Sequence, residues 1–273
     1  MILRADLHIH TTASDGTWTP EELIRQAQKC GLGLLAVTDH DSVANVAAAG
    51  RLAAQAGIKF LLASEICSTK GDLSFHILGY GIDIGNKPLL ELLRHNEALL
   101  EQKDVDSIRL LARDGWDVDE AEFARYTYDR RRGGWRALAY LIDKGLCTGV
   151  GDFFNRIFTP EHDLGFPTFP SIEEVIRTIH NSGGLAFCAH AASGFHGPGL
   201  EKVMDLLRTE NFDGFECYHS NHSEEKARRL LAHCCKHKLL ISGGSDCHGT
   251  FVPGRHLGEP YVDTAMLDLG CLL

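Results

Sequence analysis

The sequence has 273 residues, 44% of them hydrophobic, and its 37 acidic and 27 basic residues give a net charge of −10. A chain of this length forms one large α/β domain or two smaller ones, with a sizeable buried core. The acidic excess argues against partners such as long nucleic acid or an anionic membrane, although bound metal could still hold a small anionic substrate.

The nine cysteines are scattered along the chain and include no C-x-x-C pair. We therefore expect reduced, mostly buried thiols in a cytoplasmic protein. Residues 1–10 lack the basic segment and the long apolar segment of a secretory leader. No apolar run reaches the ~18 residues that are needed to cross a bilayer, so we expect no membrane span.

The first predicted strand leads into Asp6-Leu7-His8-Ile9-His10, and a loop through Asp15 follows. Alternate side chains of a strand share a face, so His8 and His10 would point the same way. Two such imidazoles can converge on one divalent cation, although a single His-x-His pattern is weak evidence and taken alone favours solvated or hydrogen-bonded histidines.

The next segments alternate between helix and strand. Thr19-Pro20-Glu21-Glu22 has the cap residue, early proline and glutamate of a helix start, and Gly31 suits the helix end. The pattern then predicts a strand at 32–37, a helix at 43–56, and strands at 58–63 and 73–80. These strands lead to, or contain, His40, Glu65 and His76.

Residues 83–170 have little strand signal and much helical periodicity. Helices are predicted at 89–112, 120–126 and 135–144, and the basic run Arg130-Arg131-Arg132 lies between the second and the third. We interpret this segment as an inserted helical cap subdomain. Residues 1–82 and 171–273 would then form one metal-binding barrel.

The strand–helix alternation resumes at Ser171-Ile172-Glu173-Glu174, which has the pattern of a capping box. The remaining predicted elements are helices at 171–182, 200–208 and 223–237, and strands at 185–189, 213–218 and 239–243. The three strands lead to His190, to His219 and His222, and to Ser245-Asp246-Cys247-His248.

Seven strands, mostly separated by helices, predict a parallel sheet covered by helices. The ligand-type residues fall at the strand ends, where β/α barrels build their sites. An open sheet would spread these ends over roughly 30 Å, whereas a barrel gathers them around one axis. We therefore predict a barrel of seven strands.

Six histidines and three carboxylates make up the candidate metal-binding set: His8, His10, Asp15, His40, Glu65, His76, His190, Asp246 and His248. One ion cannot use nine protein ligands and leave room for substrate. Three ions could share these nine ligands, with the carboxylate of Glu65 or Asp246 bridging two of the ions. We expect no metal at the other histidines: His95, His162, His180, His196, His233, His237 and His256.

The chain resembles the polymerase-and-histidinol-phosphatase (PHP) superfamily. The resemblance rests on Asp6-Leu7-His8-Ile9-His10-Thr11, Thr38-Asp39-His40-Asp41, Glu65, Ala189-His190 and Ser245-Asp246-Cys247-His248, which match that family's motifs in order. Asp15 and His76 match its trinuclear members. It is most similar to small bacterial members that act on 3′,5′-nucleoside bisphosphates, adenosine monophosphate or short RNA 5′ ends.

The resemblance implies a distorted (β/α)₇ barrel with a helical insert and a centre of three Mn, Fe or Zn ions. Carried over to this chain, the three ligand sets are His8, His10, Glu65 and Asp246; Glu65, His76 and His190; and Asp15, His40 and His248. Mixed imidazole and carboxylate ligands do not choose among these metals.

Such a centre implies hydrolysis of a phosphate ester by metal-activated hydroxide, with adjacent ions ~3.5–4 Å apart. No protein nucleophile is needed for in-line attack at phosphorus. The catalytic candidates are Asp15, His219 and His222, and either of these two histidines could give a proton to the leaving oxygen. The alternative is that these two histidines only support the site or lie solvated in a loop. Thr38, Asp39 and Ser245 are predicted to orient ligand histidines, and Cys247 to serve in packing.

The cap is predicted to bind the rest of the substrate. Arg131, Arg132 and Arg136 could hold a second phosphate, although a solvated basic stretch is the alternative. Relatives often carry Arg-x-x-Arg where this chain has Leu100 and Lys103, and Arg-Pro-His where it has Arg131-Arg132-Gly133. Lys103 joins the substrate-binding candidates, and both departures leave the substrate open.

The leading hypothesis is a metal-dependent phosphoesterase that removes a terminal phosphate from a small nucleotide, a 3′,5′-bisphosphate or an AMP-like molecule. Histidinol-phosphate phosphatase and 5′–3′ exonuclease on short RNA are alternatives with the same chemistry. A non-catalytic metal-bound regulatory module is an alternative of a different class. The oligomeric state stays open.

Overall fold

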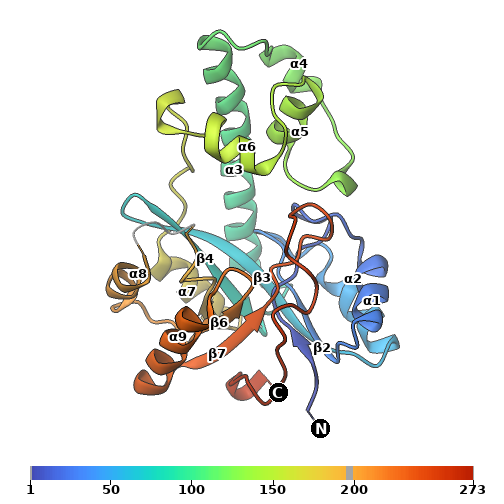
Figure 1. Cartoon of the computed structure of the whole chain (residues 1–273), viewed down its shortest axis with the longest axis vertical. Helices are drawn as coiled ribbons and strands as arrows, with labels where there is room; N and C mark the ends of the chain where they lie inside the picture. Colours follow the sequence, from blue (N-terminus) through green and yellow to red (C-terminus); the bar gives the residue numbers. More distant parts are fainter. Residues whose placement is uncertain (1, 195–198, 273) are drawn as a thin grey trace.

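The computed structural model describes residues 2–194 and 199–272. A helical cap stands on a barrel, and both termini lie at the end of the barrel away from the cap (Figure 1). The strands run in chain order around the sheet: β1 (Ala5–Asp6), β2 (Leu34–Val37), β3 (Lys59–Lys70), β4 (Leu73–Tyr80), β5 (Leu185–Cys188), β6 (Gly214–His219) and β7 (Leu240–Gly244).

The sheet closes through the residues that follow its first and last strands. The Leu7 amide donates to the Gly243 carbonyl at 3.2 Å, and the His10 amide to the Cys247 carbonyl at 2.9 Å. The Asp246 amide donates back to the His8 carbonyl at 2.8 Å. The predicted distorted seven-stranded barrel is thereby confirmed.

The prediction of a parallel sheet is wrong at β4, which pairs antiparallel with both β3 and β5. The reason is the two-residue turn between Lys70 and Leu73, since so short a connection can join only antiparallel neighbours. Gly71 supplies the positive φ, +61°, that this turn uses. Strand β3 also extends to Lys70, so Glu65 lies within the strand rather than at its end.

Helices α1 (Pro20–Lys29), α2 (Val46–Gln55), α7 (Ile172–Asn181), α8 (Leu200–Leu207) and α9 (Glu224–His237) cover the barrel. The predicted capping box at the start of α1 is confirmed, because Thr19 and Glu22 each accept the other's backbone N–H. Helix α1 then buries Leu23, Ile24 and Ala27 in the same apolar cluster as Leu35 and Val37 of β2.

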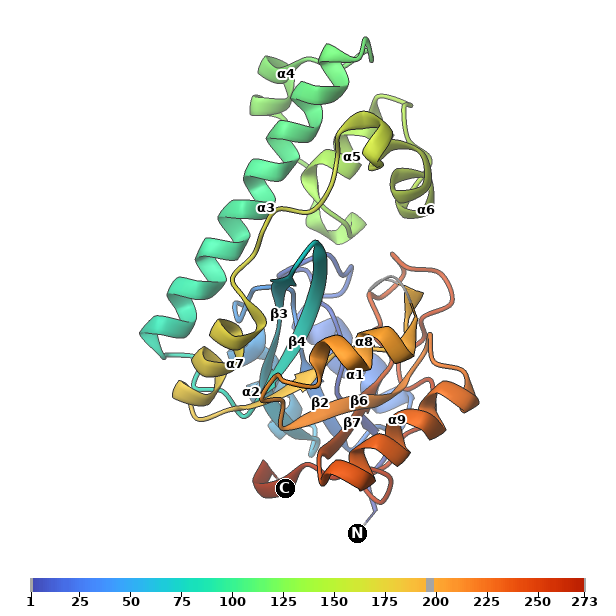
Figure 2. The same ribbon diagram turned by 90° about the vertical axis from the view of Figure 1, so that its left-hand side faces the viewer.

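The cap consists of the long helix α3 (Lys87–Arg113), α4 (Glu120–Arg125), α5 (Arg136–Asp143) and α6 (Val150–Asp152), with the 3₁₀ turns η1 (Arg130–Arg132) and η3 (Pro160–His162) and the π-helical turn η2 (Phe153–Ile157). Figure 2 shows α3 rising from the barrel into the cap. Its first half buries Leu89 and Leu93 in the barrel core, and its second half buries Ile108 and Leu111 in a separate cap core.

Helix α3 therefore belongs to both parts and fixes the cap above the barrel. The chain ends in the short 3₁₀ turn η5 (Gly270–Leu272). Within the described residues, no helix combines the length and the apolar character that a bilayer crossing needs.

Candidate metal centre

All nine residues of the predicted metal-binding set meet at one end of the barrel. Their ligand atoms form three groups, in each of which the atoms lie within 4.8 Å of one another: His8, His10, Glu65 and Asp246; Glu65, His76 and His190; and His10, Asp15, His40 and His248. The third group contains His10 in addition to the three residues expected there. The groups therefore share Glu65 and His10.

Glu65 joins the first two groups because its two oxygens face different imidazoles. Its Oε2 lies 3.1 Å from His8 Nε2 and 3.2 Å from His10 Nε2. Its Oε1 lies 3.1 Å from His76 Nδ1 and 3.0 Å from His190 Nε2. This geometry suits a carboxylate that bridges two cations.

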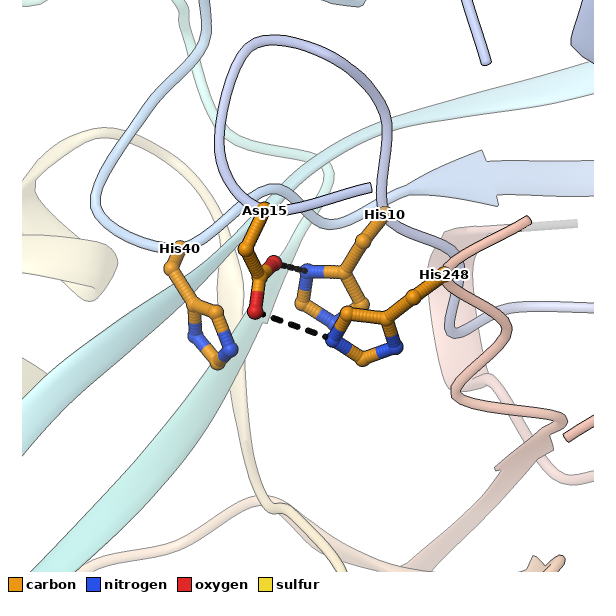
Figure 3. A group of neighbouring side chains, drawn as sticks. All are labelled: His10, Asp15, His40 and His248. Carbon is orange, nitrogen blue, oxygen red and sulfur yellow. Dashed lines mark ion pairs between the residues drawn. The ribbon is translucent and has the colours of Figure 1, made fainter. Parts of the chain in front are cut away.

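Figure 3 shows the third group, in which Asp15 lies among three imidazoles. Asp15 Oδ2 is 3.3 Å from His248 Nε2, and Asp15 Oδ1 is 3.6 Å from His10 Nδ1. The His10 and His248 rings stack with their centroids 4.1 Å apart. Because His10 Nε2 faces the first group, this one ring touches two groups.

Buried polar atoms in these groups lack the partners that an ordinary protein interior supplies. His8 Nε2, His10 Nε2, His40 Nδ1 and Glu65 Oε2 are buried and make no well-directed hydrogen bond to any described residue. Such atoms are costly to bury unless something satisfies them. Divalent cations would do so, and imidazole with carboxylate is a donor set that Zn, Fe and Mn accept.

The carboxylates of the groups are in the form that binds cations. Burial alone would raise the pKa of Glu65, but the neighbouring imidazoles, that of His8 above all, hold it well below its usual value. Asp246 has a lowered pKa for the same reason, through His8 and His10. Burial lowers the pKa of His40 to about 3, which leaves this imidazole neutral, as a metal ligand must be.

The sequence analysis missed Glu216, a fully buried carboxylate in β6. Its Oε1 lies 2.9 Å from His8 Nδ1, and its Oε2 accepts the backbone N–H of His190 at 2.7 Å. It thus fixes the orientation of one candidate ligand and the backbone of another. The available signal was a lone glutamate inside the otherwise apolar run Gly214-Phe215-Glu216-Cys217-Tyr218.

Two further groups could hold an ion by distance alone: His8, Glu216 and His219, and His40, Cys67 and His76. In the first, the Glu216 carboxylate already holds His8 Nδ1. In the second, burial raises the pKa of the Cys67 thiol well above its usual value, so the thiolate ligand form is disfavoured. Both overlap the three groups described above.

Thr38 and Asp39, predicted to orient histidines, act on the backbone that carries His10. Thr38 Oγ1 accepts the Ile9 amide at 3.0 Å. Asp39 accepts the Thr11 amide at 2.7 Å and the Ser14 hydroxyl at 2.6 Å. Ser245 similarly accepts the Cys247 amide at 3.2 Å.

The two histidines proposed as proton donors differ in geometry. His219 is buried beside the groups, with Nε2 3.1 Å from Asp246 Oδ2, and its Nδ1 accepts the Asn221 amide at 3.0 Å. His222 has both nitrogens on backbone groups, since Nε2 accepts the Ala192 amide and Nδ1 lies 3.1 Å from the Cys217 carbonyl. This favours a supporting role for His222.

The cap cations predicted to bind substrate are engaged by other side chains. Arg131 pairs with Glu22 at 2.6 Å, Arg132 pairs with Asp143 at 2.6 Å, and Arg136 pairs with Glu101 at 2.7 Å. The Lys103 ammonium lies 5.0 Å from the centre of the Phe158 ring. A second phosphate would have to compete with three carboxylates.

The histidines expected to bind no metal fall outside these groups wherever the chain is described. This holds for His95, His162, His180, His233, His237 and His256. His196 lies outside the described residues.

Comparisons with known proteins agree with this geometry. A model of the PHP domain matches residues 6–188. The 3′,5′-nucleoside bisphosphate phosphatase of Chromobacterium violaceum is 31% identical over 93% of this chain and 90% of its own length. The 5′–3′ exoribonuclease Rnm of Escherichia coli is 29% identical over 89% of this chain and 84% of its own.

A solved structure from Bifidobacterium adolescentis, described as a metal-dependent phosphoesterase, superposes with a TM-score of 0.82 at 28% identity. The superposition covers 96% of this chain and 93% of that protein. The family model thus spans the motifs from Asp6 to His76 and the whole of the insert, and the relatives align with about nine tenths of the chain. The chain belongs to the PHP domain family.

Proposed function

We propose that this PHP-family, metal-dependent phosphoesterase binds three divalent Mn, Fe or Zn ions and hydrolyses a terminal phosphate monoester of a small nucleotide. The nucleotide would be a 3′,5′-bisphosphate or an AMP-like molecule. The observation that carries the proposal is the set of three side-chain groups joined through the two oxygens of Glu65 and the two nitrogens of His10.

The protein ligands would be His8, His10, Glu65 and Asp246 for one ion, Glu65, His76 and His190 for the second, and Asp15, His40 and His248 for the third. When bound, such ions supply Lewis acidity and a hydroxide nucleophile near neutral pH. Asp15 supports this chemistry by holding the His10 and His248 rings side by side.

The leaving oxygen would take its proton from His219. The Asn221 amide donates to Nδ1 of this ring, so the ring proton lies on Nε2, the nitrogen that faces Asp246. That position is at the edge of the first group, within the region where a phosphoryl group would bind. A positioned imidazole of this kind contributes typically about 10²–10⁴-fold to rate.

The relatives' activities support a nucleotide substrate, and the cap closes over the end of the barrel where such a substrate would bind. The cap meets the Asp15 loop directly, because the Gly134 amide donates to the Asp15 carbonyl at 2.8 Å. The Arg130 side chain also donates to the Ala13 carbonyl at 3.1 Å. Residues around η1 therefore define one wall of the substrate site.

The test is the release of phosphate, or of mononucleotide from RNA, by the full chain reconstituted with Mn, Fe or Zn in turn. The substrates would be 3′-phosphoadenosine 5′-phosphate, AMP, histidinol phosphate and a 5′-phosphorylated RNA trinucleotide. We expect metal-dependent release from the bisphosphate or from AMP, and its loss in Asp246→Asn. Release from histidinol phosphate alone would overturn the nucleotide assignment, and no release from any substrate by metal-loaded protein would overturn the proposal.

A further inference from the structure

Arg255, in the loop after β7, lies against one of the candidate metal ligands. Its Nη1 contacts Asp246 Oδ2. The Asp246 side chain is 5% exposed and that of Arg255 is 23% exposed. The guanidinium thus stands between the buried carboxylate and solvent.

The two oxygens of Asp246 face in different directions. Oδ1 lies 3.1 Å from His10 Nε2 and 3.5 Å from His8 Nε2, on the side where a shared cation would bind. Oδ2 is contacted by His219 Nε2 and by Arg255. Arg255 therefore lies next to the metal groups without taking the oxygen that faces them.

Arg255 binds its carboxylate through one N–H only, unlike Arg132 and Arg156. Arg132 grips Asp143 with two nitrogens, at 2.9 and 2.6 Å, and Arg156 grips Asp152 with two at 2.7 Å. A guanidinium has five N–H donors. Within residues 2–194 and 199–272, the contact with Asp246 is the one side-chain hydrogen bond of Arg255, so its other donors remain free at a partly open edge.

The loop that carries Arg255 is held at both ends. Phe251 packs against the backbone of Gly133 and Gly134 in the cap. At the other end, the Gly258 amide donates to Asp6 Oδ2 at 2.7 Å, and the Gly258 carbonyl accepts from Arg4 at 2.9 Å. The guanidinium is consequently presented from a braced loop.

A permanent cation with free, planar donors fits the non-bridging oxygens of a phosphoryl group. Phosphoryl transfer depends on such groups because charge spreads over these oxygens in the transition state. We propose that Arg255 is a catalytic residue that binds a non-bridging oxygen of the substrate's phosphoryl group. This assignment rests on the proposed phosphoesterase function and adds a residue that no motif of the sequence indicated.

The experiment compares Arg255→Gln, Arg255→Lys and the wild type, all loaded with Mn, and uses Arg109→Gln as the matched control. Arg109 is exposed on α3 and pairs with Asp106 and Glu120, away from the metal groups. Three quantities are measured: metal bound per chain, the dissociation constant of inorganic phosphate by calorimetry, and kcat/KM on the nucleotide that the wild type hydrolyses.

We expect Arg255→Gln to keep its metal, to bind inorganic phosphate at least tenfold more weakly, and to lose about 10²–10³-fold in kcat/KM. Arg255→Lys should recover part of both losses, because lysine restores the positive charge but not the planar set of N–H donors of a guanidinium. The Arg109→Gln control should match the wild type in all three measurements.

Two results would overturn the inference. One is wild-type phosphate affinity and kcat/KM in Arg255→Gln. The other is loss of metal in step with the loss of phosphate affinity, which would mean that Arg255 acts only by positioning Asp246. Phosphate binding to the loaded protein does not depend on the identity of the organic substrate, so failure of the nucleotide assignment remains distinguishable.

Discussion

At the residue scale, the site uses buried carboxylates whose two oxygens serve different partners. Glu65 turns one oxygen to His8 and the other to His76. Glu216 turns one oxygen to a ring and the other to a backbone amide. An unpaired carboxylate oxygen is costly to bury, so the two contacts of Glu216 fix its orientation, whereas Glu65 Oε2 lacks a well-directed hydrogen bond within the described residues, and a cation would take that place. The roles of the nine side chains as metal ligands stay predictions.

The contact between Glu216 and His8 should strengthen metal binding. Glu216→Gln keeps the shape but removes the charge that holds His8 Nδ1–H, so metal affinity or activity should fall about 10–100-fold. The measurement is metal retained after dialysis against graded chelator, followed by kcat/KM. Glu173→Gln, in the exposed first turn of α7, is the matched control. Wild-type metal retention in Glu216→Gln would contradict the assigned role.

The proposed role of His219 as proton donor can be tested by substitution. In His219→Gln, kcat on a nucleotide should fall about 10²–10⁴-fold, because the alkoxide leaving group loses its proton donor. On p-nitrophenyl phosphate the loss should be much smaller, since p-nitrophenolate leaves without a proton. Equal losses on both substrates would argue that His219 only positions Asp246. His222→Gln, which removes two backbone contacts, should instead lower thermal stability.

At the element scale, the contacts between cap and barrel depend on two adjacent glycines that follow η1. A Cβ at Gly133 would stand 2.6 Å from Phe251 Cβ and 2.9 Å from the Asp15 carbonyl oxygen, at a φ of +74°. The backbone of the cap therefore approaches the Asp15 loop more closely than any side chain would allow.

Gly133→Ala tests that approach. Gly145→Ala is a matched control, because Gly145 has a φ of +71° and a methyl group added there would meet no atom within 4 Å. Both variants bear the cost of a positive φ, and Gly133→Ala should lose a further ~1–3 kcal/mol of stability through the clash. Thermal unfolding and kcat/KM of the two proteins measure the difference. Equal stabilities would show that the cap can shift freely.

The buried carboxyl of Asp104 in α3 should make the stability of the protein depend on pH. It accepts the Ala137 amide at the start of α5 at 2.9 Å, and burial raises its pKa to about 7. Glu101 also raises this pKa, whereas Arg136 and Lys103 lower it. Because the folded protein holds this proton above the ordinary pKa of 3.8, stability should fall as pH rises from about 4 to about 7.

The measurement is the change in Tm between pH 5 and pH 8. It should be larger in the wild type than in Asp104→Asn, which has no carboxyl to ionise and can still accept the Ala137 amide. Asp106→Asn, on the same helix, should behave like the wild type. Identical slopes in all three proteins would contradict the assignment of Asp104 as the group that titrates.

At the scale of the whole molecule, the barrel brings together residues from six strand regions that are far apart in the chain. The first group alone joins residues 8 and 246. Cations shared among these residues would connect β1, β3 and the segment after β7. Binding to the folded state alone stabilises a protein by about 2.7 kcal/mol when the ligand is present at 100 times its Kd.

Metal removal should therefore lower Tm. We expect a clear drop when chelator is added to Mn-loaded protein, with recovery when Mn is restored. In Glu65→Gln the difference between loaded and chelated protein should shrink, because Glu65 belongs to two of the groups. Differential scanning calorimetry gives both values, and a Tm that does not respond to chelator in the wild type would contradict a metal centre built into the fold.

Local patterns of the sequence predict much of this protein's structure. The capping residues Thr19 and Ser171, the apolar strand runs and the motifs around His8, His40 and Asp246 act over a few residues, so they predict the elements, the barrel and the nine side chains that meet at its end. The antiparallel course of β4, the carboxylate partners of the three cap arginines, and the places of Glu216 and Arg255 became visible only in the folded chain. Those features depend on contacts between distant segments, and the spacing of residues along a chain carries no information about which distant groups will neutralise one another's charge.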